Sequence, residues 1–319
     1  MDRIENMDKI VVIVGPTATG KTKLAVTLGK LLDGEVISAD SMQLYRGMDI
    51  GTAKVTAEEM EGVVHHMVDV AEPEEEFSAA RFVEMADPIL ADILDRGKTA
   101  VVAGGTGLYV DSLIAGRTFA PYPTTGKREA LEQEADRLGM EVMLERLRQV
   151  DPDSGARLHP ADRKRILRAL EVYAETGKTI TQHNRETQLQ PAKYQPVWLG
   201  LDFADRADLY RRIDRRVDLM LQQGLLEEIQ RLLDRGVPKT CTAMQAIGYK
   251  EFFPVLPGTE PLETAVERVK RESRRYAKRQ KTWFRRNPNI HWILQQDPPD
   301  FSAVLEEALA QIPFFDAGP

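Results

Sequence analysis

The residues most suited to chemistry form a glycine-rich segment near the start of the chain. Residues 15–22 read GPTATGKT and match the phosphate-loop pattern G-x-x-x-x-G-K-[ST] in full. An apolar run at 9–14 precedes this segment, and a stretch with helical spacing follows it. The glycines allow backbone N–H groups to turn toward a phosphate, and Lys21 adds a full positive charge. We therefore predict a site for a diphosphate or triphosphate, with the Thr22 hydroxyl as a ligand of Mg²⁺.

Two further residues narrow the chemistry of this site. Asp40 ends a segment at 35–40 that we predict to be a strand, so its carboxylate is expected at the edge of the sheet beside the phosphates. There it can hold Mg²⁺, act as a general base for an acceptor nucleophile, or cap a helix. Thr106 follows a strand predicted at 99–104, where a hydrolysing NTPase would carry an acid. A hydroxyl cannot supply that charge, which disfavours a conventional NTPase.

The elements that position these residues alternate between strands and helices. Strands are predicted at 9–14, 35–40, 99–104, 197–201 and 290–294, with helices at 21–32 and 78–96 between the first three. This alternation is typical of a parallel sheet with crossover connections, which is an α/β fold.

Helical patterns dominate the middle of the chain. We predict helices at 127–138, 141–149 and 163–176, and interpret 119–196 as an all-helical insertion. The catalytic core then comprises 1–118 and 197–319. Two long helices are predicted in its second part, at 205–235 and 268–285.

Length and charge limit the class of protein. The chain has 319 residues, which fits two domains, and its net charge is −7. The charge is uneven, because residues 56–92 hold eleven acidic side chains against one basic, and residues 268–286 hold ten basic against one acidic. The basic segment indicates either a polyanionic partner or a solvated, salt-bridged helix.

Several classes of protein are disfavoured by composition. The single cysteine, Cys241, excludes an intramolecular disulfide and a zinc site built on cysteine pairs. The sequence has no run of about 18 uncharged apolar residues, and its first residues are too polar for a signal peptide. We therefore expect no membrane contact and a cytoplasmic location. We also expect a monomer.

Six segments together resemble the tRNA dimethylallyltransferase family, also called tRNA isopentenyltransferases. They lie at 15–22, 40–54, 104–109, 165–172, 245–250 and 278–285, in the family's order along the chain. The phosphate loop is shared by many families, whereas the segment at 40–54 is far more specific. The enlarged family members with a C-terminal zinc finger are not matched, because one cysteine cannot build that module.

The resemblance implies an activity, a fold and two substrates. The family transfers a dimethylallyl group from dimethylallyl diphosphate to N6 of adenosine 37, next to the tRNA anticodon, and releases diphosphate. Its fold is a P-loop core that carries a helical insertion contacting tRNA, with Mg²⁺ as the cofactor. The flipped adenine and the diphosphate enter one channel from opposite ends.

The resemblance also implies roles for individual residues. Asp40 corresponds to the catalytic aspartate that accepts a proton from N6, and Thr106 is expected to form a hydrogen bond near the reacting centre. Lys164 stands where many family members carry glutamine. The residues expected at the diphosphate are Gly15, Thr17, Ala18, Thr19, Gly20, Lys21, Thr22 and Arg212. The residues expected at the tRNA are Asp40, Ser41, Met42, Gln43, Thr106, Arg128, Lys164, Arg165, Arg168, Gln245, Gly248, Tyr249, Lys250, Lys278, Arg279, Lys281 and Arg285.

Two alternative functions remain at this point. A small-molecule P-loop kinase would use ATP, with the helical insertion as its lid, and would need no basic helix. An RNA-binding module that depends on a nucleotide would leave Asp40 without a task. A transferase is distinguished from both by tRNA binding with a steep salt dependence and by the consumption of a prenyl donor.

Overall fold

The computed structural model describes residues 8–117, 119, 125–188 and 191–315. The chain divides into two compact units. The first consists of Met1–Gly116 and Lys193–Pro319, and the second of Arg117–Ala192. The predicted insertion at 119–196 overlaps the second unit, and the predicted boundary at residue 118 lies outside the described residues.

Six parallel strands form one sheet in the first unit, in the order β3-β2-β4-β1-β5-β6. The strands are β1 (Ile10–Val14), β2 (Gly34–Ser38), β3 (His65–His66), β4 (Thr99–Gly104), β5 (Val197–Phe203) and β6 (His291–Gln295). The five predicted strands and the α/β class are confirmed. Strand β3 was not predicted, because two residues are too few to show a periodic pattern.

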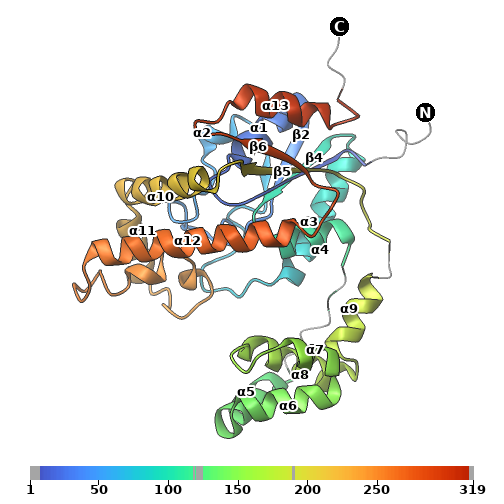
Figure 1. Cartoon of the computed structure of the whole chain (residues 1–319), viewed down its shortest axis with the longest axis vertical. Helices are drawn as coiled ribbons and strands as arrows, with labels where there is room; N and C mark the ends of the chain where they lie inside the picture. The colour runs from blue at the N-terminus through green and yellow to red at the C-terminus, as the bar shows by residue number, and fades with distance from the viewer. Residues whose placement is uncertain (1–7, 118, 120–124, 189–190, 316–319) are drawn as a thin grey trace. The chain divides into compact units, whose positions relative to one another are not determined.

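Helices cover both faces of this sheet, because alternate residues of a strand point to opposite sides. In β1, Val11 and Ile13 share a core with α1 (Lys21–Leu31) and α13 (Phe301–Ala310). Residues 10, 12 and 14 share the other core with α3 (Ala79–Asp95) and α4 (Gly107–Ala115). Figure 1 shows these layers around the sheet. Each fully buried aliphatic side chain stabilises the fold by about 1.5–3 kcal/mol.

The predicted helix at 205–235 is wrong as a single element. It is two helices, α10 (Arg206–Gln222) and α11 (Leu225–Asp234), separated by Gly224 with φ of 95°. A left-handed residue ends the regular helix, and glycine adopts that conformation at little cost. The basic helix, α12 (Leu262–Phe284), starts earlier than predicted, immediately after Pro261. The remaining short elements are α2 (Ala57–Met60) and the 3₁₀ turns η1 (Ala243–Gln245) and η2 (Lys250–Phe252).

The second unit is helical, as predicted. Its helices are α5 (Lys127–Leu138), α6 (Met140–Val150), α7 (Pro152–Arg157), α8 (Arg163–Thr176) and α9 (Ile180–Gln188). Leu131, Leu144, Leu147 and Ile166 belong to a separate apolar core. This unit therefore has its own hydrophobic centre, as expected of an insertion that folds compactly.

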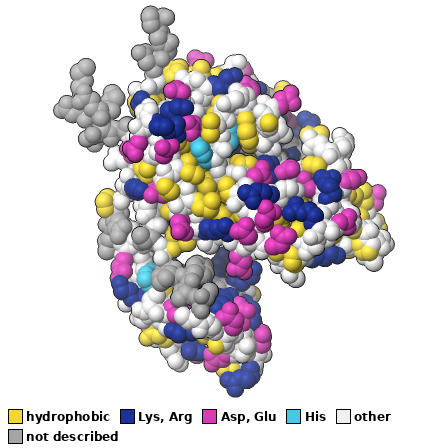
Figure 2. Space-filling view, turned by 180° about the vertical axis from the view of Figure 1, so that it is seen from behind, with side chains coloured by type: hydrophobic (Ala, Val, Ile, Leu, Met, Phe, Trp, Pro, Cys, Tyr) yellow, Lys and Arg dark blue, Asp and Glu magenta, His cyan; other side chains and the backbone are white. Residues whose placement is uncertain are grey.

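The surface is that of an ordinary charged protein. Acidic and basic side chains are interspersed on the face drawn in Figure 2. The surface of the protein carries ion pairs such as Lys30–Glu61 and Arg46–Glu72. Within the described ranges, none of the helices has the length and apolar character needed to cross a membrane.

Candidate active site

The phosphate loop connects the end of β1 to the first turn of α1. Gly15 has φ of 140°, and a Cβ atom there would lie 2.2 Å from the carbonyl oxygen of Leu201, so only glycine fits. The Thr19 hydroxyl and the Lys21 ammonium group donate hydrogen bonds to the Pro16 carbonyl at 2.9 and 2.7 Å. The loop is therefore closed by its own side chains, with Lys21 folded across it.

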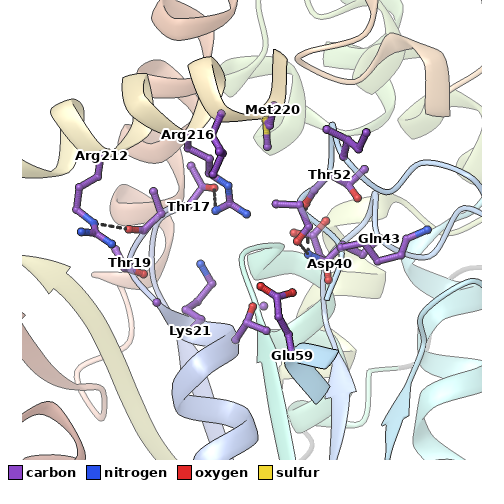
Figure 3. Close-up of a pocket in the computed structure, with 18 of the residues that line it drawn as sticks. Thr17, Thr19, Lys21, Asp40, Gln43, Thr52, Glu59, Arg212, Arg216 and Met220 are labelled. Carbon is purple, nitrogen blue, oxygen red and sulfur yellow. Dashed lines mark hydrogen bonds between the residues drawn. The ribbon is translucent and has the colours of Figure 1, made fainter. Parts of the chain in front are cut away.

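A cavity of about 680 Å³ lies beside the loop. Figure 3 shows Lys21 entering it from α1, Arg216 from α10, and Asp40 from the segment after β2. Of the residues predicted from the sequence, those that line the cavity are Thr17, Ala18, Thr19, Gly20, Lys21, Thr22, Asp40, Gln43 and Arg212. The tertiary structure thus brings the predicted phosphate site and the predicted base to one cavity.

Asp40 and Thr106 come from two segments that touch along their backbones. The Thr106 N–H donates to the Ala39 carbonyl at 3.1 Å, and a Cβ atom on Gly104 would lie 2.2 Å from that same oxygen. The Thr106 hydroxyl accepts a hydrogen bond from the Ser41 N–H at 3.0 Å and donates to the Ser41 hydroxyl at 3.2 Å. Asp40 and Thr106 are therefore held close to each other after strands β2 and β4.

The Asp40 side chain does not cap a helix, since the residues that follow form a turn. Its Oδ1 atom accepts a hydrogen bond from the Met42 N–H at 2.9 Å. A turn of this kind fixes the carboxylate relative to the backbone while the side chain still lines the cavity. This hydrogen bond holds the carboxylate in an orientation from which it can contact a ligand in the cavity.

Burial and charge act together on the cations of the cavity. Burial and, to a smaller extent, the Arg216 cation lower the pKa of Lys21, the Asp40 carboxylate opposes both effects, and the resulting pKa is about 8. Burial also lowers the pKa of Arg216, again with Asp40 acting in the opposite direction. The pKa of Tyr276, which also lines the cavity, is raised to about 12, mainly by burial and next by the Asp40 charge. Two partly buried cations facing one carboxylate leave positive charge available for an anionic ligand.

Arg216 was not assigned to the site from the sequence, although it lies one turn after Arg212 on α10. Its guanidinium donates to the Thr17 hydroxyl at 3.3 Å. Arg212 donates to the Ala18 carbonyl at 3.2 Å and pairs with Asp297 at 3.1 Å. Both line the cavity, so Arg212 stays a predicted diphosphate ligand and Arg216 is added to it. The four-residue spacing was the signal available in the sequence.

We expect Arg216→Ala to weaken binding of inorganic diphosphate by at least about tenfold, because a charge-assisted hydrogen bond contributes about 1.5–3 kcal/mol. Arg212→Ala should cost less, because part of that cation's charge is already matched by Asp297. Isothermal titration calorimetry on the two variants measures both losses. A larger loss for Arg212→Ala would reverse the ranking.

Gln280 is a second residue that sequence reasoning missed. It lies in α12 and is 5% exposed, and its Oε1 accepts a hydrogen bond from the Thr17 N–H at 3.0 Å. Its Nε2 donates to the Gly105 carbonyl at 3.0 Å. One buried amide therefore joins the phosphate loop to the segment before Thr106. Nothing in the sequence pattern of a basic helix indicates this contact.

The basic helix α12 has a paired face and an exposed face. Lys270 pairs with Asp218 at 2.7 Å and Arg274 with Asp214 at 2.5 Å, while Lys281 pairs with the buried Asp202. The exposed cations predicted to contact tRNA are Lys278, Arg279 and Arg285. Arg279 lies over the Tyr276 ring, 5.6 Å from its centre. Among the described residues, Lys278 and Arg285 have no ion-pair partner, whereas Lys281 is already held by Asp202.

The predicted tRNA residues at 245–250 differ in exposure. Gln245 and Lys250 are exposed, and Gly248 is buried with its N–H donating to Glu251 at 2.9 Å. The Tyr249 side chain is fully buried, and its hydroxyl donates to Glu228 at 2.7 Å. A buried side chain cannot contact tRNA directly, so the role of Tyr249 is structural, through its hydrogen bond to Glu228.

The predicted tRNA residues of the second unit are mostly engaged in ion pairs. Arg128 and Arg168 pair with Glu171 at 3.7 and 3.0 Å, and Arg165 pairs with Asp162 at 2.8 Å. Lys164 is exposed and has no ion pair within the described part of the unit. Their contact with tRNA stays a prediction.

The oxygen donors at the site fit Mg²⁺. The Thr22 hydroxyl and the Asp40 carboxylate both line the cavity. In the described part of the chain, no three His, Cys, Asp or Glu side chains gather into a metal site. Mg²⁺ that is held mainly by substrate phosphates and water does not require such a cluster.

The fold and the loop define an α/β protein of the P-loop class, with a cavity at the carboxyl ends of its strands. A family model described as IPP transferase matches residues 43–287. The chain belongs to this IPP transferase family.

Relatives and solved structures agree with this assignment. A tRNA dimethylallyltransferase of Geobacillus thermodenitrificans is 48% identical over 306 residues, covering 96% of both chains. The full-length tRNA isopentenylpyrophosphate transferase of Bacillus halodurans has a TM-score of 0.70 at 45% identity, covering 94% of each chain. A eukaryotic dimethylallyltransferase acting on tRNA has a TM-score of 0.81 at 31% identity, covering 97% of this chain and 81% of its own.

Proposed function

We propose that the protein transfers a dimethylallyl group from dimethylallyl diphosphate to N6 of adenosine 37 in tRNA and releases diphosphate. The observation that carries this proposal is that the phosphate loop, Asp40 and Gln43 line one cavity. The loop suits the diphosphate, and the segment beginning at Asp40 suits the acceptor base. Relatives named tRNA dimethylallyltransferase align with nearly the whole length of this chain and with nearly the whole length of their own chains.

In this reaction, the bond between N6 and C1 of the dimethylallyl group forms while the bond between C1 and the diphosphate oxygen breaks. The electron pair of the broken bond leaves with the diphosphate, where negative charge grows. Lys21, Arg216 and the backbone amides of the loop, which all belong to residues lining the cavity, would stabilise that charge. Stabilisation of this kind is usually the largest catalytic contribution. Thr22 would hold Mg²⁺, which when bound neutralises further charge on the diphosphate.

Adenine N6 is a weak nucleophile because its lone pair is delocalised into the ring. The Asp40 carboxylate would accept the proton that N6 loses, and its turn with Met42 keeps it oriented. The Thr106 hydroxyl, fixed by Ser41, would complete the polar surroundings of the reacting nitrogen. The base must leave its stack to reach this cavity.

One assay tests the function directly. The protein is incubated with labelled dimethylallyl diphosphate, Mg²⁺ and undermodified tRNA, and the label is followed into adenosine 37 by nucleoside analysis. A tRNA with guanosine at position 37 serves as the matched control and should take up no label. Consumption of ATP without prenyl transfer would instead support the kinase alternative.

The monomeric state and cytoplasmic location stay predictions.

The exposed face of α12 is expected to bind tRNA phosphates. Replacing Lys278 and Arg285 with alanine should reduce the slope of log K against log salt by about 0.7–0.9 for each phosphate contact that is lost. Lys270→Ala is the matched control, because this cation is paired with Asp218 and should leave the slope unchanged. An unchanged slope in the double variant would place the RNA elsewhere. Filter binding over a range of salt concentrations measures these slopes.

A further inference from the structure

Residues of the segment 49–54 line one wall of the cavity. The side chain that holds this segment in place lies outside the cavity. That anchor is the Glu228 carboxylate on α11, which is 1% exposed. The mechanism proposed above does not use this residue.

Glu228 accepts four hydrogen bonds. Its Oε2 atom accepts from the N–H groups of Asp49 at 2.9 Å and Ile50 at 2.8 Å. Its Oε1 atom accepts from the Gly51 N–H at 3.1 Å and from the Tyr249 hydroxyl at 2.7 Å. Three successive backbone N–H groups turned toward one carboxylate form an anion-binding turn. No cation pairs with Glu228 within the described ranges, so these four donors compensate its charge.

Tyr249 closes the same contact from the other side. A Cβ atom on Gly51 would lie 2.5 Å from the Tyr249 ring, so the ring packs directly on the glycine backbone. Burial and the Glu228 charge raise the pKa of Tyr249 well above its usual range, which keeps the hydroxyl protonated as a donor. The anchor therefore combines close packing with hydrogen bonds.

The anchored segment in turn holds Gln43. The Gln43 Nε2 atom donates to the carbonyls of Thr52 at 3.3 Å and Ala53 at 3.1 Å. Its Oε1 atom accepts from the Ser38 hydroxyl at 3.2 Å. Figure 3 shows Gln43 and Thr52 next to each other on the same side of the cavity as Asp40. A shift of the segment would therefore turn the Gln43 amide.

We propose that Glu228 is a positioning residue for the acceptor base: it holds residues 49–51 and, through residues 52–53, sets the Gln43 amide that meets the adenine. This inference rests on the proposed function, in which Gln43 lies at the extruded adenosine. It predicts that substitution of Glu228 impairs the reaction of tRNA and leaves the binding of diphosphate nearly unchanged.

Glu228→Gln tests this, because the amide keeps the shape but turns an N–H₂ group toward backbone N–H donors. We expect kcat/KM for tRNA to fall by about tenfold or more, while the dissociation constant for inorganic diphosphate changes by less than about twofold. Tyr249→Phe removes one of the four donors and should cause a smaller loss of the same kind. Thermal melting of each variant confirms that the protein remains folded.

A double-mutant cycle with Gln43→Ala decides whether Glu228 acts through Gln43. The variant with both substitutions should lose no more activity than Gln43→Ala alone, because residues acting in series are not additive. Additive losses of activity in this cycle would overturn the inference. So would a loss of diphosphate affinity as large as the loss in kcat/KM for tRNA. If Glu228→Gln does not fold, the same cycle with Tyr249→Phe decides. Wild-type transfer in this assay tests the proposed function separately.

Discussion

Replacing Asp40 with alanine is expected to lower the rate of dimethylallyl transfer in a single turnover by about 10² or more, while tRNA affinity stays nearly unchanged. The reason is that alanine cannot accept the proton from N6, whereas the tRNA is held over a much larger surface. Rapid-quench measurements with enzyme in excess over tRNA give the rate of this step without product release.

Asp40→Asn is the matched control for the turn at this position. Asparagine keeps an oxygen that can accept from the Met42 N–H, as Oδ1 of Asp40 does at 2.9 Å, but it is not a base at neutral pH. If Asp40 works as the base, both variants should be slow. Near wild-type transfer by Asp40→Asn would mean that the turn, and not proton transfer, is what the reaction needs.

The second large effect is expected at Lys21. Lys21→Met should weaken binding of diphosphate by about 10² and slow transfer further, because this cation faces both the ground-state and the developing charge. Lys23→Met on the same helix is the matched control, since Lys23 lies over the Phe301 ring and does not line the cavity. If Lys23→Met weakened diphosphate binding as much as Lys21→Met, the effect would come from the overall charge of the protein and not from the position of Lys21.

The pH dependence of the same residue follows from its environment. The pKa of Lys21 is lowered to about 8, so the free protein loses this charge as the pH rises through about 8. Diphosphate binding should therefore weaken between pH 7 and pH 9, and above pH 8 binding should take up a proton. Calorimetry in buffers with different heats of ionisation detects that proton. Lys21→Met should lack it, and an equal uptake in that variant would assign the proton to another group.

Local patterns predicted much of the fold. The strand at 9–14, the glycines at 15–20 and the helix that follows are recognisable because a strand, a tight turn and a helix each depend on neighbouring residues. The predicted helix at 205–235 failed at Gly224, since the apolar spacing continues through a residue whose backbone is left-handed. Spacing reports which side chains share a face, and it does not report backbone conformation.

The site was predicted only in part for a related reason. Arg216 and Gln280 reach the site, and Glu228 holds one of its walls, from helices that are far from the phosphate loop in sequence. A buried amide that accepts from Thr17, or a carboxylate behind a cavity wall, leaves no pattern in the residues around it. Such contacts depend on which helices pack together.

The sequence by itself determined the phosphate loop, the α/β class and the resemblance to a tRNA-modifying family, because these depend on residue types at fixed spacing. Only the tertiary structure decided which cations remain available. Of the basic residues counted in the sequence at 268–286, Lys270, Arg274 and Lys281 are neutralised by aspartates of α10 and β5, while Lys278 and Arg285 remain exposed. The physical reason is that a charge acts on a partner only where no nearer opposite charge has already compensated it.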